Sequence, residues 1–316
     1  MPRVSAAVLN YNGRELLEVI MPSLAAQDHP DFEVVVVDNG STDDSVAYLR
    51  EHWPQARVVS PGADNIGVAA ALNLAVRSCR GELIALLNND IELDPRWLSE
   101  LVLALDRHPR ASMVACKLMR YYERDVLDGA GNVFTRSATG WQRGQGERDL
   151  GQFELEEEVF APTAGAALYR ARALAEVGPF DESFWAYFED VDWGLRAQIA
   201  GLRCWYAPAA VAYHMGSHTT KGDANPLYFE LQRRNTLALL IKDVPLSFML
   251  RNAHHILLHH TLSLIYSARA GMLGAHLRAV RSAWRGAPVW RAQRRHILGG
   301  RGIGLSEFNR FVSARR

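Results

Sequence analysis

The sequence predicts an α/β fold, with a mostly parallel central sheet flanked by helices and followed by a helical C-terminal extension. Over about the first 110 residues, apolar strand-like runs alternate with helical stretches, as in right-handed βαβ units. Several of these runs end in a carboxylate or an amide, at the sheet edge where parallel strands bind ligands. From Pro226 onward the pattern is helical.

The first elements follow from residue type and spacing. Val4–Asn10 is an apolar strand, and Arg14–Gln27 carries leucines at helical spacing. Asp31–Asp38 contains four consecutive valines, which is typical of a strand buried on both faces. A helix is expected over Thr42–His52, with Ser41 or Thr42 as its cap.

The later elements are predicted in the same way. Proline at the first turn favours a helix from Pro95, and the glycine-rich stretch Gly129–Gly151 predicts a loop or small hairpin. The remaining expected strands are Arg57–Ser60, Glu82–Leu87, 112–119, the end of Ala161–Tyr169, Arg203–Tyr206 and Ala210–His214. The remaining expected helices are Asn65–Arg80, Pro95–Arg107, Ala171–Val177 and Asp190–Gly201.

Size and charge divide the chain in two. At 316 residues and 48% hydrophobic, it can form one large domain with an appendage. Residues 1–243 hold 23 basic and 34 acidic residues, whereas residues 244–316 hold 12 basic residues and one acidic residue. We expect an α/β domain over residues 1–225 and a basic, helical, membrane-associating region over residues 226–316.

Cysteine use and hydropathy indicate the compartment. Cys79, Cys116 and Cys204 fit no disulfide framework and are interpreted as reduced thiols, which favours a cytoplasmic protein. The N-terminus has no signal-peptide layout, and no run approaches the ~18 apolar residues of a membrane span.

Asp38 follows the valine strand at the expected ligand-binding edge. Its carboxylate can accept a hydrogen bond from a base with an N–H on its pairing edge, such as uracil, thymine or guanine. Asn39-Gly40-Ser41-Thr42 equally suits a plain turn. Asn65 and Gly67 open a helix whose first N–H groups could face an anion, although a single glycine is also ordinary turn chemistry.

Two further acidic clusters are candidates. Asn88-Asn89-Asp90 ends a strand, and Asp90 suits Mg²⁺ or Mn²⁺, which prefer oxygen ligands. Glu189-Asp190-Val191-Asp192 lies among aromatic residues, and a carboxylate beside apolar rings has the raised pKa that suits a general base. An acidic first helical turn would also explain Asp190 and Asp192, and Trp185 and Trp193 could equally belong to the core.

The basic candidates are weaker. His214 ends an apolar run and could ligate a metal, with His218 as a competitor. Arg233 and Arg234 suit phosphate oxygens, although a solvated helix face is the more frequent explanation for such arginines.

The chain resembles glycosyltransferase family 2, whose catalytic domain has the Rossmann-like GT-A fold. The matching segments are VSAAVLNYNG, VVVVDNGSTDDS, DNIGVAAALNLA, LIALLNNDIEL, VGPFDESFWAYFEDVDWGLRAQIAG and AVAYHMGS. They span about residues 4–242, and the most similar subgroup is the bacterial rhamnosyltransferase-like enzymes of polysaccharide and cell-wall assembly.

The resemblance implies a role for each matching residue. Asp38 matches the acid that binds the nucleotide base, and Asp90 the last position of a metal-binding D-x-D motif whose first position here is Asn88. Asp190 matches the catalytic base, and His214 a histidine that ligates the metal in some relatives. The expected nucleotide-sugar-binding residues are Asn10, Asp38, Asn39, Asn65, Gly67, Asn88, Asn89 and Arg233. The expected acceptor-binding residues are Trp185, Glu189 and Trp193.

The resemblance also implies the reaction. A nucleotide-diphosphate sugar binds with Mg²⁺ or Mn²⁺, Asp190 takes a proton from an acceptor hydroxyl, and one displacement inverts the anomeric carbon. The donor is expected to be a UDP-sugar or dTDP-rhamnose, and the acceptor a glycan or lipid-linked glycan. A sugar-nucleotide pyrophosphorylase would need a glycine-rich loop after the first strand, where Asn10-Tyr11-Asn12-Gly13 does not fit. A non-catalytic scaffold remains the other alternative.

The basic tail suggests a partner. Leu246–Arg285 carries apolar residues and arginines at helical spacing, which favours an anionic membrane surface at the inner face of the plasma membrane. A homo-oligomer interface is an alternative. Nucleic acid is disfavoured, because aromatic residues are few there.

Overall fold

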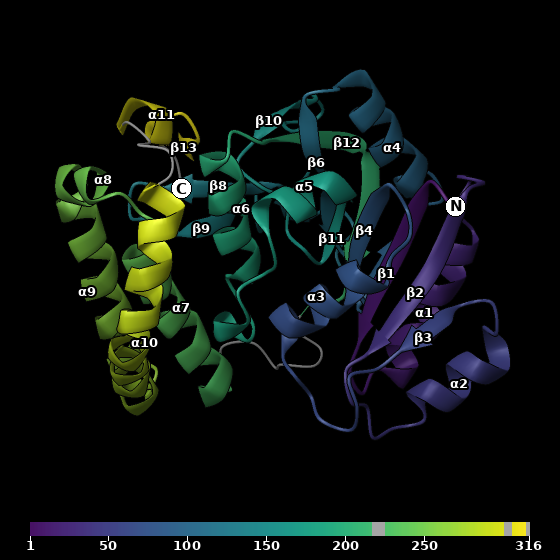
Figure 1. Cartoon of the computed structure of the whole chain (residues 1–316), viewed down its shortest axis with the longest axis horizontal. Helices are drawn as coiled ribbons and strands as arrows, with labels where there is room; N and C mark the ends of the chain where they lie inside the picture. The colour runs from purple at the N-terminus through teal and green to yellow at the C-terminus, as the bar shows by residue number, and fades with distance from the viewer. Residues whose placement is uncertain (217–224, 300–304, 314–316) are drawn as a thin grey trace.

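The computed structural model of the chain describes residues 1–216, 225–299 and 305–313. Within these ranges, ten strands form one sheet and three form a smaller one (Figure 1). The large sheet runs in the order β10 (Glu157–Val159), β12 (Arg203–His214), β6 (Ala111–Arg120), β11 (Ala166–Arg170), β4 (Leu83–Asn88), β1 (Val4–Asn10), β2 (Phe32–Asp38) and β3 (Arg57–Val59), with β5 (Ile91–Leu93) on β12 and β7 (Leu127–Ala130) on β6.

The strands from β4 to β3 are all parallel, and β11 lies antiparallel between β4 and β6. The helices of the α/β body are α1 (Arg14–Ala25), α2 (Ser45–His52), α3 (Val68–Ser78), α4 (Trp97–Arg107), α5 (Ala171–Val177), the 3₁₀ helix η1 (Glu182–Phe184) and α6 (Glu189–Ile199). The predicted fold class is confirmed.

Strand β1 shows how the sheet is buried on both faces. Val4, Ala6 and Val8 belong to a core shared with α1, α2 and α4, whereas Ala7 and Leu9 belong to a core shared with α3 and α6 on the other face. Successive side chains of a strand point to opposite faces, so an unbroken apolar run suits a sheet with helices on both sides.

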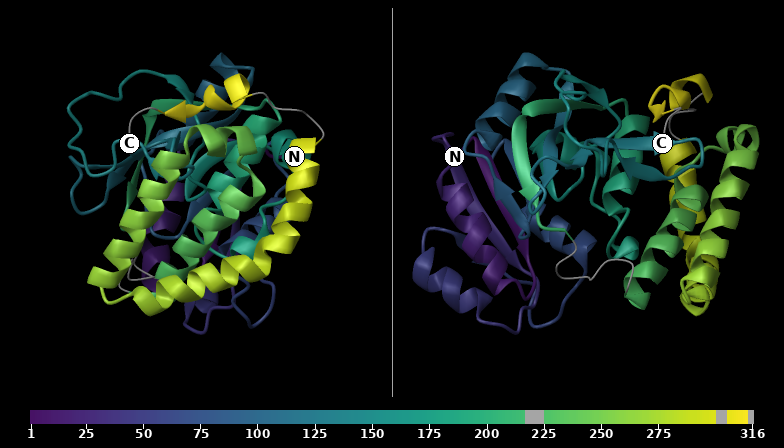
Figure 2. Two further views of the ribbon diagram at one scale, coloured as in Figure 1. Left: turned by 90° about the vertical axis from the view of Figure 1, so that its left-hand side faces the viewer. Right: turned by 180° about the vertical axis from the view of Figure 1, so that it is seen from behind.

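The C-terminal region is a group of helices beside the α/β body (Figure 2). Its elements are α7 (Pro226–Lys242), α8 (Leu246–Arg251), α9 (Ala253–Arg269), α10 (Leu273–Gly299), α11 (Leu305–Asn309) and β13 (Val312–Ser313). In Figure 1, α9 and α10 lie farther from the large sheet than α7. None of the described helices is both long and apolar enough to span a bilayer.

A third core joins these helices to the body. Phe134 and Phe160 of the body pack with Leu239, Phe248 and Phe308 of the C-terminal region. Strand β13 also pairs with β8 (Asn132–Thr135), which forms the small sheet with β9 (Gly140–Gln142). The division at residues 225 and 226 stays a prediction.

The structure corrects several predicted boundaries. Helix α2 begins at Ser45 with Asp44 at its N-cap position, so neither Ser41 nor Thr42 caps it. The Ser41 hydroxyl accepts from the Asn12 N–H (2.9 Å), and the Thr42 hydroxyl donates to Asn12 Oδ1 (3.3 Å). The two strands expected around residues 203–214 form one strand with a bulge between Ala207 and Val211. Strand β13 was missed, because two residues carry no usable periodicity.

Candidate functional site

Asp38 ends β2 beside Asn10, which ends β1 in register with it. The Asn10 Nδ2 donates to one carboxylate oxygen of Asp38 (3.1 Å), and the Ser41 N–H donates to the other (3.1 Å). Asn89 Nδ2 donates in turn to Asn10 Oδ1 (2.8 Å). All of these side chains except Ser41 are buried, so Asn10 and Asn89 hold the Asp38 carboxylate in one orientation.

The loop around Gly67 is held by its own amides. Asn39 Oδ1 accepts from the Ile66 N–H (3.1 Å), and Asn65 Oδ1 accepts from the Gly67 N–H (2.9 Å). The Ala69 N–H donates to the Trp185 carbonyl (3.1 Å). The N–H groups of Ile66, Gly67 and Ala69 thus have protein acceptors, and nucleotide-sugar binding by Asn65 and Gly67 stays a prediction.

Gly67 has a second role. Its φ is +85°, and a Cβ added there would lie 2.6 Å from the Trp185 ring. The glycine thus leaves room for the indole of Trp185, whose ring centroid is 6.5 Å from that of Tyr228. Trp185 is half-buried and stays a candidate for substrate contact.

Asp90 follows β4 and meets His214 at the end of β12. The Asp90 Oδ2 lies 3.3 Å from His214 Nε2, and His214 Nδ1 lies 2.7 Å from Asp128 Oδ2. Burial lowers the His214 pKa, but the hydrogen bonds with Asp128 and Asp90 outweigh it and raise the pKa to about 10. Sequence reasoning missed Asp128, which lies in the short strand β7. His218 lies outside the described residues.

The donor set fits a divalent cation only in part. The buried Oδ1 of Asp90 has no hydrogen-bond partner among the described residues, as expected of a carboxylate oxygen that binds a ligand from outside the chain. No group of three or more His, Cys, Asp or Glu side chains in those residues could hold a metal alone. Asp90 therefore fits a cation that takes its other ligands from phosphate oxygens and water, and His214 could join it only after its Nε2, now paired with Asp90, has lost its proton.

Asp190 lies in the first turn of α6, where its half-buried carboxylate is surrounded by polar groups. One oxygen accepts from the Val191 N–H (2.8 Å), and the other lies 3.5 Å from Asn132 Nδ2. The Thr163 hydroxyl and the Ala164 N–H also favour its charged form and lower its pKa. Burial raises the Asp190 pKa, and these hydrogen bonds offset it only in part.

Glu189, the neighbour of Asp190, is buried, and its Oε2 has no hydrogen-bond partner among the described residues. Burial, and then the charge of Asp190, raise the Glu189 pKa to about 8. Two adjacent carboxyls with raised pKa values are typical of sites that transfer protons.

A chain of contacts joins the three acidic positions. Asp38 connects through Asn10 to Asn89, which precedes Asp90. The Asn88 N–H donates to the Gly165 carbonyl (2.8 Å), and Asn132 Nδ2 contacts both the carbonyl of Pro162 (3.2 Å), three residues before Gly165, and Asp190 Oδ2 (3.5 Å). Residues separated by about 150 positions in sequence thus meet along one edge of the sheet.

The segment before Asp190 has a strained backbone. Trp185, Tyr187 and Phe188 have φ values of +62°, +67° and +65°, which are rare for residues other than glycine. The buried Asn235 of α7 holds this segment, with its Nδ2 at 3.0, 2.9 and 2.7 Å from the carbonyl oxygens of Phe184, Ala186 and Tyr187. Such strain clusters at functional sites, and sequence reasoning missed Asn235.

Two predicted site residues are corrected. Trp193 is 1% exposed, and its indole N–H donates to the Gly178 carbonyl (3.0 Å), so it is a core residue and offers no acceptor surface. Arg233 places its guanidinium 4.5 Å from the Phe229 ring centroid and lines a cavity among the C-terminal helices. The surroundings of these two side chains could not be predicted from the sequence, because the direction of a side chain depends on how whole helices pack.

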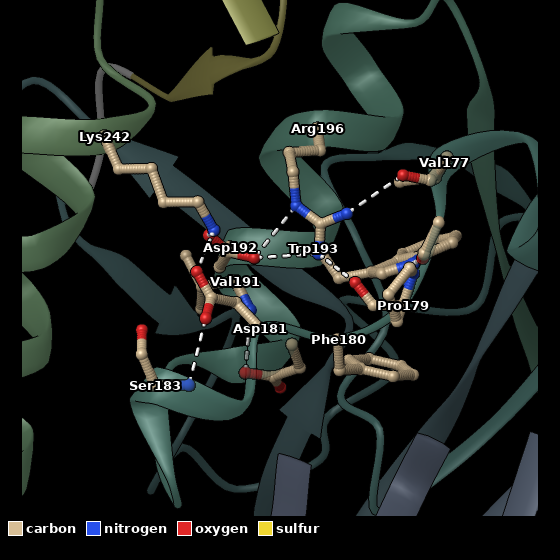
Figure 3. Close-up of polar contacts among 12 residues, drawn as sticks. Val177, Pro179, Phe180, Asp181, Ser183, Val191, Asp192, Trp193, Arg196 and Lys242 are labelled. Carbon is tan, nitrogen blue, oxygen red and sulfur yellow. Dashed lines mark hydrogen bonds and ion pairs between the residues drawn. The ribbon is translucent and has the colours of Figure 1, made fainter. Parts of the chain in front are cut away.

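A buried ionic network connects α6 to Lys242 of α7 (Figure 3). Asp192 pairs with Arg196 (2.9 Å) and with the Nζ of Lys242, which also lies 2.7 Å from Asp181 Oδ2. Arg196 also donates to the carbonyls of Val177 (3.1 Å) and Pro179 (2.9 Å). Asp192, two residues after Asp190, is therefore a structural anchor and is not available to substrate.

Comparison with known proteins identifies relatives of the chain. Residues 5–178 match the sequence model of glycosyl transferase family 2. The chain is 32% identical over 234 residues to the O-antigen biosynthesis protein RfbC of Myxococcus xanthus, a match that covers 71% of this chain and 18% of that protein. It is 28% identical over 238 residues to the N-acetylglucosaminyl-diphospho-decaprenol L-rhamnosyltransferase of Mycobacterium tuberculosis, covering 68% of this chain and 76% of that protein.

A solved structure shares the fold. The mannosyltransferase PcManGT from Pyrobaculum calidifontis, in complex with GDP-Man and Mn²⁺, superposes with a TM-score of 0.58 at 21% identity. The match covers 94% of this chain and 85% of that chain. The likeness establishes a GT-A architecture for the α/β body.

Proposed function

The chain belongs to glycosyl transferase family 2, and from this premise we propose that it is an inverting, metal-dependent glycosyltransferase. The contact chain that joins Asp38, Asp90 and Asp190 carries the proposal. We assign one role to each of these residues: Asp38 recognises the base, Asp90 contributes to diphosphate binding, and Asp190 accepts a proton.

The donor binds along the strand ends. The carboxylate of Asp38, fixed by Asn10 and Ser41, accepts a hydrogen bond from the N–H of a uracil or thymine base. Asp90, with His214 beside it, would hold Mg²⁺ or Mn²⁺, and the bound cation would supply positive charge next to the diphosphate. Asp128, hydrogen-bonded to the other ring nitrogen, orients His214 toward Asp90.

Asp190 acts as the general base. Its raised pKa increases its affinity for a proton, while the hydrogen bonds from Asn132 and Thr163 hold it in place. The acceptor hydroxyl gives its proton to Asp190, its oxygen bonds to the anomeric carbon, and the bond to the nucleoside diphosphate breaks on the opposite face. Glu189, next to Asp190 in the chain, and the half-buried Trp185 are proposed to contact the acceptor.

The similar proteins suggest a donor and an acceptor for the reaction. We favour dTDP-rhamnose over UDP-sugars as donor because of the likeness to the rhamnosyltransferase. The acceptor is proposed to be a glycan or lipid-linked glycan of cell-surface polysaccharide assembly. The exposed apolar side chains and the arginines of α9 and α10 support peripheral attachment to the inner face of the plasma membrane.

The test measures transfer and binding separately. Asp190→Asn should lower kcat by about 10²–10⁴-fold, since it removes the base, and should leave the Kd for dTDP with Mn²⁺ unchanged. Turnover is measured with a panel of nucleotide sugars, and the product's anomeric configuration by NMR.

The exposed Asp125→Asn, at an ion pair with Arg148 away from the cluster, is the matched control and should keep full activity. Wild-type turnover by Asp190→Asn would refute the base assignment. Nucleotide-sugar binding by the native protein without turnover of any acceptor would favour a non-catalytic scaffold.

A further inference from the structure

A cavity of about 490 Å³ lies among α7, α9 and α10. It is separate from the strand-end cluster, the group formed by Asp38, Asp90 and Asp190, none of which lines it. Its walls are largely aliphatic, with Leu237 and Ile241 from α7 and Val280 and Ala283 from α10. Cavities of ~300–1,000 Å³ with apolar walls and a few polar groups are the usual size and kind of small-molecule sites.

Exposed apolar side chains surround the cavity. Leu257, Leu264 and Trp284 line it and are 67%, 42% and 73% exposed. Helix α9 contributes only Ile256 and Ser267 as buried residues, so most of its length lacks a covering partner among the described elements. Figure 2 shows α9 and α10 on the outside of the molecule. Exposed apolar patches of this kind mark interaction sites.

Two arginines make the cavity cationic. Arg233 and Arg291 line it together with His260 and His276, whose pKa values are lowered by burial, and no acidic residue appears among the described lining residues. Burial, and then the positive charges of His259, His276 and Arg233, lower the His260 pKa to about 4. The buried Nε2 of His260 has no hydrogen-bond partner among the described residues. The surroundings therefore favour an anion beside an apolar group.

We propose that this cavity binds an anionic lipid, with the apolar chain between α9 and α10 and the phosphate beside Arg291 and Arg233. If the cavity had only apolar walls, it would bind any apolar chain. Because two arginines also line it, we expect it to prefer a chain that carries a phosphate. The site is separate from the strand-end cluster, so it stands independently of the proposed reaction.

The test uses soluble probes and the full-length chain, because Phe248 and Phe308 share a core with Phe134 and truncation would expose it. Binding of dodecyl phosphate, dodecyl maltoside and inorganic phosphate is compared by calorimetry below micelle formation. Dodecyl phosphate should bind about tenfold or more tightly than either of the others, because only it offers both chain and anion.

Two variant pairs locate the site. Val280→Phe, which fills the cavity, should weaken dodecyl phosphate binding about tenfold, and Val289→Phe on the exposed part of the same helix should not. Arg291→Gln should weaken dodecyl phosphate but not dodecyl maltoside, whereas Arg295→Gln, which does not line the cavity, should change neither. Arg291 is exposed, so Arg291→Gln should fold normally. If Val280→Phe unfolds, binding of dodecyl phosphate by Arg291→Gln tests the proposal instead.

Vesicles separate a bound lipid from a bilayer surface. Phosphatidylglycerol vesicles should bind the native chain more tightly than phosphatidylcholine vesicles, and Val280→Phe should weaken that binding. Vesicle binding without dodecyl phosphate binding would overturn the proposal in favour of surface attachment alone. A dimer that Val280→Phe dissociates, with no affinity for dodecyl phosphate, would overturn it in favour of a second copy as occupant.

Discussion

Gly67 and Gly178 have nearly the same backbone conformation but different surroundings. Their φ values are +85° and +86°, yet a Cβ at Gly67 would meet the Trp185 ring at 2.6 Å, whereas a Cβ at Gly178 has nothing within 4 Å. Gly67→Ala should therefore lower the unfolding temperature more than Gly178→Ala and should also weaken nucleotide binding. Gly178→Ala reports backbone strain alone, so equal effects of the two variants in thermal unfolding would exclude a role for the Trp185 contact.

Glu189 should make stability depend on pH. Its pKa is about 8 in the folded protein against an ordinary value of 4.5. Between these values the folded state keeps a proton that the unfolded state releases, so the free energy of unfolding falls as pH rises through this window. Glu189→Gln should flatten that slope in denaturant titrations from pH 5 to 9, because glutamine does not titrate.

The exposed Glu176→Gln removes the same charge from the surface of α5 and should keep the native slope. An unchanged slope in Glu189→Gln would mean that Glu189 is already ionised in the folded protein.

At the scale of elements, the ionic network connects α6 to α7. Lys242 is 2% exposed and contacts both Asp192 and Asp181. Lys242→Met should cost about 3–5 kcal/mol of stability, because it leaves buried carboxylates without their cation. Arg278→Met breaks an exposed pair with Glu230 (2.7 Å) and should cost only about 0–1 kcal/mol. Urea titrations with similar losses for both variants would contradict the structural role of the network.

Helix α7 also bears on the site itself. Asn235 holds the carbonyls of the strained segment before Asp190, and Arg234 donates to the Ser183 and Phe184 carbonyls (2.7 Å each). The C-terminal region therefore positions the proposed base, although it contributes no residue to the strand-end cluster. Helix α7 is therefore attached to the body both by these hydrogen bonds and by the shared hydrophobic core.

At the scale of the whole molecule, the sequence predicted the sheet and its acidic edge. Asp38 and Asp90 follow strands whose apolar runs are unambiguous, so their placement follows from βαβ geometry alone. Asn132, Thr163 and Asp128 were not predictable, because they come from short strands and loops whose positions depend on distant contacts. Trp185 and Trp193 looked alike in sequence, and only helix packing distinguishes the half-buried ring from the core ring.

The central claim is that Asp38, Asp90 and Asp190 serve one bound nucleotide-diphosphate sugar. A crystal structure with Mn²⁺ and either UDP or dTDP tests it most directly. The account predicts the base hydrogen-bonded to Asp38, Mn²⁺ between Asp90 and the diphosphate, and Asp190 facing the sugar position. A nucleotide bound away from Asp38, or Mn²⁺ bound without Asp90, would contradict it.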